Sequence, residues 1–205
     1  MTAGDGSNIE ARRALLIGLL DDSNAGVRRC AAIGLEKLEA SEALHQLSDR
    51  LHGDNTVERV QAVYALGKVP GDTSLRTIVG LLKDDAEDVR AAAARVLDDL
   101  RDPRAVKYLV EALEDTSFTV RGIVADTLGK MKDRKVVPFL ISQLGAPADS
   151  YVEKVIRALG DLGDPRAEGP LTRFTEHDNP KLRGLAAIAL GMLSVTTVGS
   201  ATSGT

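Results

Sequence analysis

Few side chains in this sequence could act as metal ligands. The histidines are His45, His52 and His177, and Cys30 is the single cysteine. Zinc sites usually take closely spaced ligands from one helix or loop, and the sequence holds no His-x3-His or Cys-x2-Cys pair. We therefore predict no metal site.

Cys30 is the one candidate nucleophile. A cysteine reacts as the thiolate and needs a base or a positive charge beside it, and the sequence places no histidine or other base next to Cys30. The alternative is that Cys30 is a small, half-buried structural residue. We favour that alternative and predict no catalytic residue and no cofactor.

Acidic pairs gather around residues 84–99, as Asp84-Asp85, Glu87-Asp88 and Asp98-Asp99. They could form a calcium site, but they lie at a helix start and a helix end and do not follow the pattern of an EF-hand loop. Acidic residues in a first helical turn favour the positive end of the helix dipole. We therefore interpret them as solvated helix caps.

Composition excludes further classes of function. The 205 residues carry a formal net charge of -4, and no glycine-rich phosphate loop is present. A protein that binds a DNA duplex needs a basic track along its binding surface, whereas this sequence carries charges of mixed sign. The longest apolar runs are too short to span a bilayer. We expect neither nucleic acid nor a membrane as a partner.

A 31-residue repeat organises the chain. A leucine, here called the register leucine, recurs every 31 residues. Apolar residues lie four positions before it and three positions after it, which puts all three on one face of a helix. A second apolar set in each unit marks a second helix. The register leucines, exactly one repeat apart, are Leu35, Leu66, Leu97, Leu128, Leu159 and Leu190.

This pattern predicts an all-α fold, an α-solenoid of the armadillo or HEAT-like superhelical kind with six helical hairpins of 31 residues each. Asp-Pro and similar pairs at the unit boundaries act as N-caps followed by a first-turn proline. The predicted helices span 9–20, 25–38, 41–52, 56–69, 72–83, 87–100, 103–114, 118–131, 134–144, 150–162, 165–176 and 180–193.

The two ends differ from the repeats. We expect a flexible N-terminus over residues 1–8, a repeat domain over 9–193 and a disordered polar tail over 194–205. The start of the chain lacks the basic and apolar segments of a signal peptide, so the expected compartment is the cytoplasm. Repeat six keeps Leu185 and Ile188 where a terminal cap is usually polar. Two interpretations are open: the tail covers this end, or the terminal repeats self-associate by stacking against another copy.

The unit D-x-x-x-V-R-x-x-A-A-x-x-L-G-x-L followed by D-P-R-A resembles the short HEAT repeat named after phycobilisome lyases. It stands here as Asp85–Leu100 with Asp102–Ala105, and as Asp115–Met131. The resemblance implies the solenoid fold over residues 9–193. It leaves function open, because such repeats occur in bilin lyases, in a di-iron hydroxylase and in adaptors. The hydroxylase relies on His-Glu pairs, which this sequence lacks.

One arginine recurs at the start of the second helix. Five of the six repeats carry it, as Arg28, Arg59, Arg90, Arg121 and Arg183, while repeat five has Val152. Repetition favours a structural role, in which the guanidinium binds the loop aspartates or loop carbonyls of its own or a neighbouring repeat. The alternative is that it binds a partner. The missing arginine marks repeat five as a predicted weak point or bend.

In the HEAT arrangement the second helices line the concave face. Two sets of equivalent, outward-facing positions on that face differ in residue type from repeat to repeat. Either they are adapted to one partner, or the surface is unconstrained and has accumulated neutral changes. Exposed apolar, tyrosine and arginine side chains favour a protein partner. The predicted partner-binding residues are Arg29, Ile33, Val60, Tyr64, Arg95, Asp126, Glu153, Arg157 and Ile188.

Two functions remain from the sequence. The first is a non-enzymatic scaffold or adaptor that binds a protein on its concave face. The second follows from the resemblance alone and is the only enzymatic one. In it the chain is a subunit of a bilin lyase, or a bilin-handling chaperone of the phycobilisome type, in which an arginine pairs with a propionate and Tyr64 stacks on the tetrapyrrole.

Overall fold

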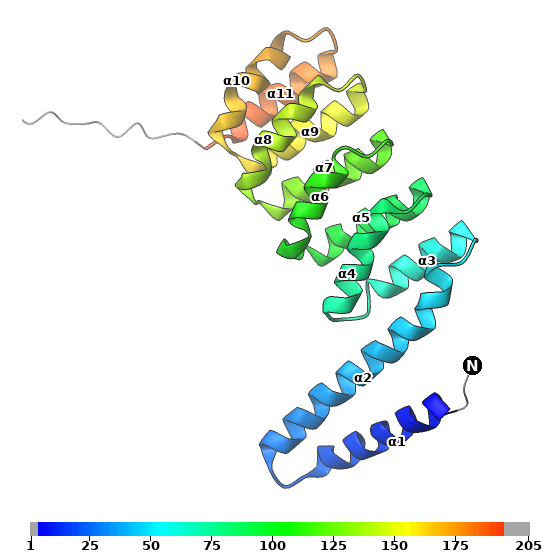
Figure 1. Cartoon of the computed structure of the whole chain (residues 1–205). Coiled ribbons are helices and arrows are strands. Elements are labelled where there is room, and N and C mark those ends of the chain that lie inside the picture. The colour runs from blue at the N-terminus through cyan, green and yellow to red at the C-terminus, as the bar shows by residue number, and fades with distance from the viewer. Residues whose placement is uncertain (1–3, 195–205) are drawn as a thin grey trace, which may run out of the picture. The chain divides into compact units, whose positions relative to one another are not determined.

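The computed structural model describes residues 4–194, and all the regular elements within that range are helical. The chain divides into two compact units, residues 1–80 and 81–205 (Figure 1). The all-α HEAT-type solenoid fold is confirmed. Of the predicted flexible N-terminus over residues 1–8, residues 1–3 lie outside the described residues and residues 4–8 are helical. The predicted tail beyond Ser194 also lies outside the described residues.

Unit 1 contains four α-helices: α1 (Gly4–Gly18), α2 (Ala25–Leu51), α3 (Thr56–Leu66) and α4 (Asp72–Gly80). A 3-10 turn, η1 (Leu19–Asp21), follows α1. Helix α2 packs against α1 and α3. Helix α1 begins five residues before the predicted start at residue 9.

The prediction of two separate helices over 25–38 and 41–52 is wrong, because α2 runs through both without a break (Figure 1). The first two repeats therefore share one 27-residue helix, and the chain does not form six separate hairpins. The physical reason is local. The junction reads Glu39-Ala40-Ser41, which lacks the proline, glycine or aspartate cap that ends a helix at the other boundaries.

Unit 2 contains the remaining repeats, and its helices form two rows (Figure 1). The second helices of the repeats lie side by side as neighbours in one row, and the first helices lie in the other. The second helices are α5 (Glu87–Leu100), α7 (Phe118–Met131), α9 (Asp149–Leu162) and α11 (Pro180–Met192). The first helices are α6 (Val106–Ala112), α8 (Val137–Ser142) and α10 (Glu168–Arg173). Short 3-10 turns begin or end the repeats: η2 (Leu81–Lys83), η3 (Pro103–Ala105), η4 (Arg134–Val136), η5 (Gln143–Gly145), η6 (Pro165–Ala167) and η7 (Phe174–Glu176).

The register leucines form the core of each unit. Leu66, Leu97, Leu128 and Leu159 are fully buried, and each stabilises the fold by about 1.5–3 kcal/mol. Leu35 and Leu190, in the first and last repeats, are only half-buried. The same sequence position therefore contributes less to stability in these two repeats, where the leucine is only half-buried.

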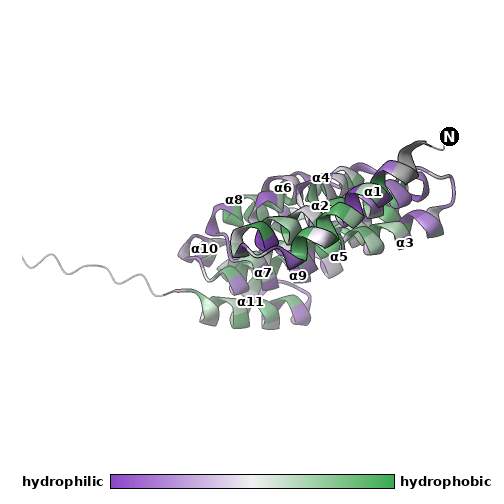
Figure 2. Ribbon diagram, turned by 90° about the horizontal axis from the view of Figure 1, so that it is seen from below, coloured by the Kyte–Doolittle hydropathy of each residue, from purple (hydrophilic) through white to green (hydrophobic). Residues whose placement is uncertain are grey.

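Small residues let the second helices of unit 2 approach closely. A Cβ atom on Gly129 would lie 2.8 Å from the Cα of Ala158, and one on Gly160 would lie 3.0 Å from the Cα of Ala189. Both alanines are buried. Helix α11 is largely apolar along its length (Figure 2), which suits a packing surface for α9.

Candidate functional site

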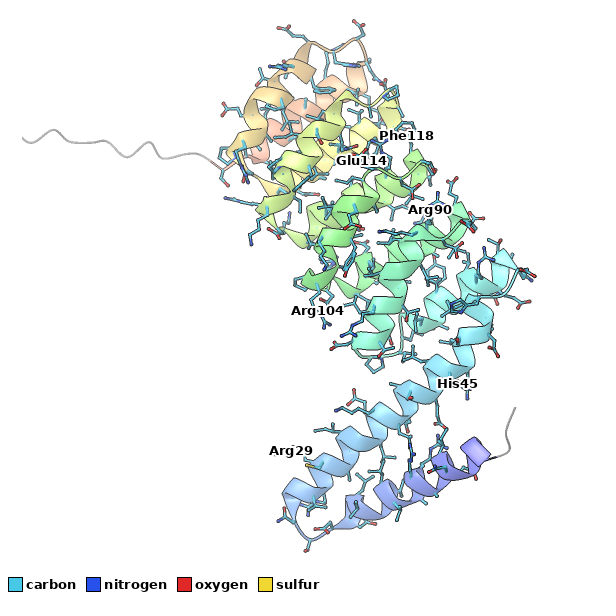
Figure 3. All side chains as sticks on the ribbon, in the orientation of Figure 1. Arg29, His45, Arg90, Arg104, Glu114 and Phe118 are labelled. Carbon is cyan, nitrogen blue, oxygen red and sulfur yellow. The ribbon has the colours of Figure 1, made fainter. Side chains whose placement is uncertain are left out.

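Arg90 binds two loops at once. It lies in the first turns of α5, at the same edge of unit 2 as Phe118 (Figure 3). Its Nε and Nη2 donate to the two carboxylate oxygens of Asp115 at 2.7 and 2.9 Å, and Nη1 donates to the carbonyl oxygens of Asp84 and Asp85 at 2.9 and 3.1 Å. The predicted structural role of this arginine, reaching into a neighbouring repeat, is confirmed.

Both members of this ion pair are nearly buried, with 12% of the Arg90 side chain and 5% of the Asp115 side chain exposed. Burial alone raises the pKa of Asp115. The hydrogen bonds from Arg90 and from the Ser117 N–H outweigh it, so the pKa of Asp115 lies below its ordinary value. The carboxylate therefore stays charged and bound to Arg90.

Three of the other repeated arginines bind the loop of their own repeat. Arg28 donates to the carbonyl oxygens of Asp22 and Ser23, and Arg183 does the same to those of His177 and Asp178. Arg59 donates to the carbonyl oxygen of Gly53 at 2.8 Å. Loop carbonyls are thus the partners that these three arginines share with Arg90, whereas Arg121 binds the Gln143 side chain.

Repeat five replaces the arginine with a buried cluster that the sequence pattern did not predict. Tyr151 is 1% exposed, and its hydroxyl donates to Oε1 of Gln143 at 3.1 Å. Arg121 also binds Gln143, and its guanidinium lies 4.8 Å from the ring of Phe118 and 4.7 Å from that of Tyr151. The weak point predicted here stays a prediction. The structure shows a tyrosine filling the position beside Val152.

The aspartates at the repeat boundaries cap the helices that follow them, as predicted. Oδ1 of Asp102, Asp133 and Asp164 each accepts a hydrogen bond at 2.9 Å from the backbone N–H two residues later. The hydrogen bond from the Arg166 side chain lowers the pKa of Asp164 to about 2. Within residues 4–194 no group of three or more potential ligands could hold a metal ion.

Cys30 is exposed rather than half-buried, so the predicted burial is wrong. It lies in the first turns of α2, where Arg28 and Arg29 are exposed as well and the adjacent Ala31 is the buried side chain.

In unit 1, the predicted partner-binding residues lie on α2 and α3. Ile33 and Tyr64 are 46% and 42% exposed, Arg29 is exposed and Val60 is half-buried. Ile33 lines a groove of about 800 Å³ between α2 and the segment from Pro70 to Thr77. The continuous α2 forms one wall of this groove.

In unit 2, the predicted residues lie along the row of second helices. Arg95 and Asp126 line a common groove of about 410 Å³ between α5, α7 and α9. Arg95 and Arg157 are exposed, and within residues 4–194 neither has an ion pair. Ile188 is 63% exposed.

Asp126 and Glu153 already have partners inside the chain. Lys154 pairs with Asp126, and Nζ of Lys181 lies 2.7 Å from Oε2 of Glu153. Nζ of Lys130 pairs in the same way with Asp98, at 2.5 Å. These lysines, about one repeat after their acids, tie successive second helices together, and comparing charges across neighbouring repeats would have found them.

The last helix of the described residues exposes apolar side chains. Ile188 and Met192 of α11 are 63% and 48% exposed, as Leu185 and Ile188 led us to expect. Self-association through these ends stays a prediction. No helix in the described part of the chain is both long and apolar enough to cross a bilayer.

Residues 45–117 and 74–159 match the family model for HEAT repeats, and together they cover more than half of the chain. No curated protein matches the sequence.

The fold is similar to solved structures of repeat proteins. One is the complex of CpcE and CpcF of phycocyanin lyase from Nostoc sp. PCC7120, with a TM-score of 0.62 and 27% identity over 78% of this chain and 65% of that chain. This chain therefore spans less than two thirds of the lyase chain that it matches. Two further structures are below 25% identity and bear on the fold alone. The Escherichia coli protein YibA has a TM-score of 0.56 and 22% identity, over 93% of this chain and 71% of its own. A designed armadillo repeat protein in complex with the peptide (KR)4 has a TM-score of 0.54 and 14% identity, over 94% of this chain and 96% of its own.

The buried register leucines, the repeated arginine that binds its own loop and the match to the family model agree with one another. The chain belongs to the family of HEAT-repeat proteins.

Proposed function

We propose that the chain is a non-catalytic scaffold that binds a protein partner on the face formed by its second helices. The observation that carries this proposal is the exposure of apolar and aromatic side chains at the variable positions of that face. Ile33, Tyr64 and Ile188 are each more than 40% exposed, whereas the register leucines of the inner repeats are fully buried. Exposed side chains of this kind are typical of protein-binding surfaces.

The charges of the face support the same function. Its lysine–acid pairs hold neighbouring helices in register, which leaves Arg95 and Arg157 to meet a partner. Arginine is enriched among the residues that dominate binding energy because its planar fork of donors fits carboxylates and carbonyls. Solved repeat proteins with a bound protein or peptide give a precedent for this fold.

A tryptophan placed on this face tests the proposal. Gly184 lies on α11 in the same variable column as Arg29, and a Cβ there would meet no atom within 4 Å. Gly184→Trp should therefore fold normally and block the face. We expect a pull-down that recovers a stoichiometric protein with the unmodified chain to lose that protein with this variant.

Gly145→Trp is the matched control, because Gly145 is equally open but lies in the η5 loop. It should keep the partner. Retention of the partner by Gly184→Trp, with both variants melting at the temperature of the unmodified chain, would show that the face is not used.

A second function is that of a bilin lyase subunit or bilin-handling chaperone. The likeness to the CpcE–CpcF complex at 27% identity favours it. Under this function, purified protein mixed with a free bilin should shift and intensify the visible absorption band. An unchanged spectrum would rule out the bilin function, and the scaffold function would be the one that remains.

A further inference from the structure

Unit 2 has a second groove, on the row of first helices and away from the face discussed above. It has a volume of about 560 Å³ and runs between α6 and α8. Its apolar residues are Pro103, Val106, Val110, Val136 and Phe139. Val136 is buried and forms the floor, Val106 and Val110 are half-buried, and Phe139 is 50% exposed.

Phe139 is unusual for its position. A phenylalanine ring that stays half in water forgoes much of the stabilisation that burial would give, of about 1.5–3 kcal/mol. The same column of the first helix holds Leu15, Gln46, Thr77, Tyr108 and Pro170 in the other five repeats. The stack does not require an aromatic residue here, so Phe139 is free to serve a contact outside the chain.

The rim of the groove is basic. Arg104, Lys107 and Lys135 line it, against one acidic residue, Asp133. The carboxylate of Asp133 accepts the backbone N–H of Lys135 as a helix cap, and Arg104 is paired with Asp102 at 2.6 Å. Lys107 lies over the ring of Tyr108, 4.5 Å from its centroid, which leaves its positive charge uncancelled.

An acidic residue on the same helix as Lys107 is engaged elsewhere. Glu111, one turn after Lys107, pairs with Lys83 at 3.2 Å. Within residues 4–194 the Lys135 side chain has no ion pair. The groove therefore combines an apolar floor with two lysines, on α6 and η4, that form no ion pair within the described part of the chain.

We propose that this groove binds a short amphipathic segment of a partner protein, with an apolar side chain packed between Val110, Val136 and Phe139 and acidic side chains beside Lys107 and Lys135. Apolar grooves commonly bind the apolar face of such segments. Opposite charges at the rim fix the direction of the segment and raise its association rate. This surface is distinct from the second-helix face, so either site can be present without the other.

Selection from a random library of displayed 12-residue peptides tests the proposal. The library is selected on the folded full chain and counter-selected on Phe139→Ser. Phe139 is half exposed, so its replacement should leave the fold intact. We expect the enriched peptides to combine Asp or Glu with Leu, Ile or Phe, and to bind Phe139→Ser at least tenfold more weakly than the unmodified chain.

Two matched variants locate the site. Lys135→Glu should weaken the enriched peptides at least tenfold, whereas Arg95→Glu, the same charge reversal on the second-helix face, should not. Tyr64→Ser removes another exposed aromatic residue, 42% exposed, and should leave peptide binding unchanged.

Several outcomes would overturn the proposal. They are enrichment of basic peptides, no enrichment over the Phe139→Ser counter-selection, and equal loss of binding in Arg95→Glu. Binding of the chain to vesicles that contain anionic lipid is measured as a separate experiment. Phe139-dependent binding to vesicles without any peptide binding would assign the groove to a membrane surface instead.

Discussion

At the scale of single residues, Arg90 stabilises the stack by joining the loop of its own repeat to that of the next. Its removal leaves the carboxylate of Asp115, which is 5% exposed, without its ion pair. Losing one partner of a buried ion pair is costly because the other charge remains desolvated. We expect Arg90→Ala to lower the free energy of unfolding by about 3 kcal/mol, measured by urea denaturation.

Arg183→Ala is the matched control in the same column. Arg183 is exposed and binds only the carbonyl oxygens of His177 and Asp178, so its loss should cost about 1 kcal/mol. Equal losses in the two variants would argue against the ion pair as the source of stability. Folded Arg90→Ala should bind a partner with unchanged affinity.

At the scale of elements, the residues at the end of a second helix decide whether the chain turns there or continues as one helix into the next repeat. In repeats three to five the residue that follows the helix is left-handed: Arg101 has φ 47°, Lys132 has φ 58° and Gly163 has φ 62°. An aspartate then caps the next helix. The matching residues in repeat one, Glu39 and Ala40, are helical.

These observations give a prediction for the continuous α2. In the unmodified chain, Cα chemical shifts should remain helical without interruption from residue 30 to residue 48. The variant Glu39→Gly/Ala40→Asp/Ser41→Pro introduces a left-handed residue, a cap and a first-turn proline, and it should break that run at residues 39–40. Non-helical shifts at residues 39–41 of the unmodified chain would contradict the continuous helix.

Each feature that repeats was predictable from the sequence. The register leucines predicted which face of each helix is buried, and the repeated arginine predicted a contact with the loops. Both predictions were possible because a residue type that recurs across six copies of a unit points to a structural role. Single departures were harder to predict. Tyr151 and Gln143 occur once, so no other repeat indicates their contact. The three lysine–acid pairs recur but join neighbouring repeats, so they show only when charges are compared between repeats.

At the scale of the whole molecule, burial differs from one end of the chain to the other. Residues 8–18 of α1 include no buried side chain, and α2 buries only Ala31, Leu47 and Leu51 over 27 residues. Helices α7 and α9 each bury at least seven residues out of 14. In a repeat protein, local stability follows from the interfaces that each repeat makes.

Amide hydrogen exchange should therefore form a gradient along the chain. We expect the amides of α1 to exchange fastest, because few buried contacts oppose its opening, and those of α7 and α9 to exchange slowest, near the rate of global unfolding. Arg90→Ala should accelerate exchange in α5 and at the start of α7, which its ion pair joins, and leave α1 unchanged. Uniform protection from α1 to α11 would mean that the chain opens as one cooperative block, and that the stability of a repeat does not depend on its own buried contacts.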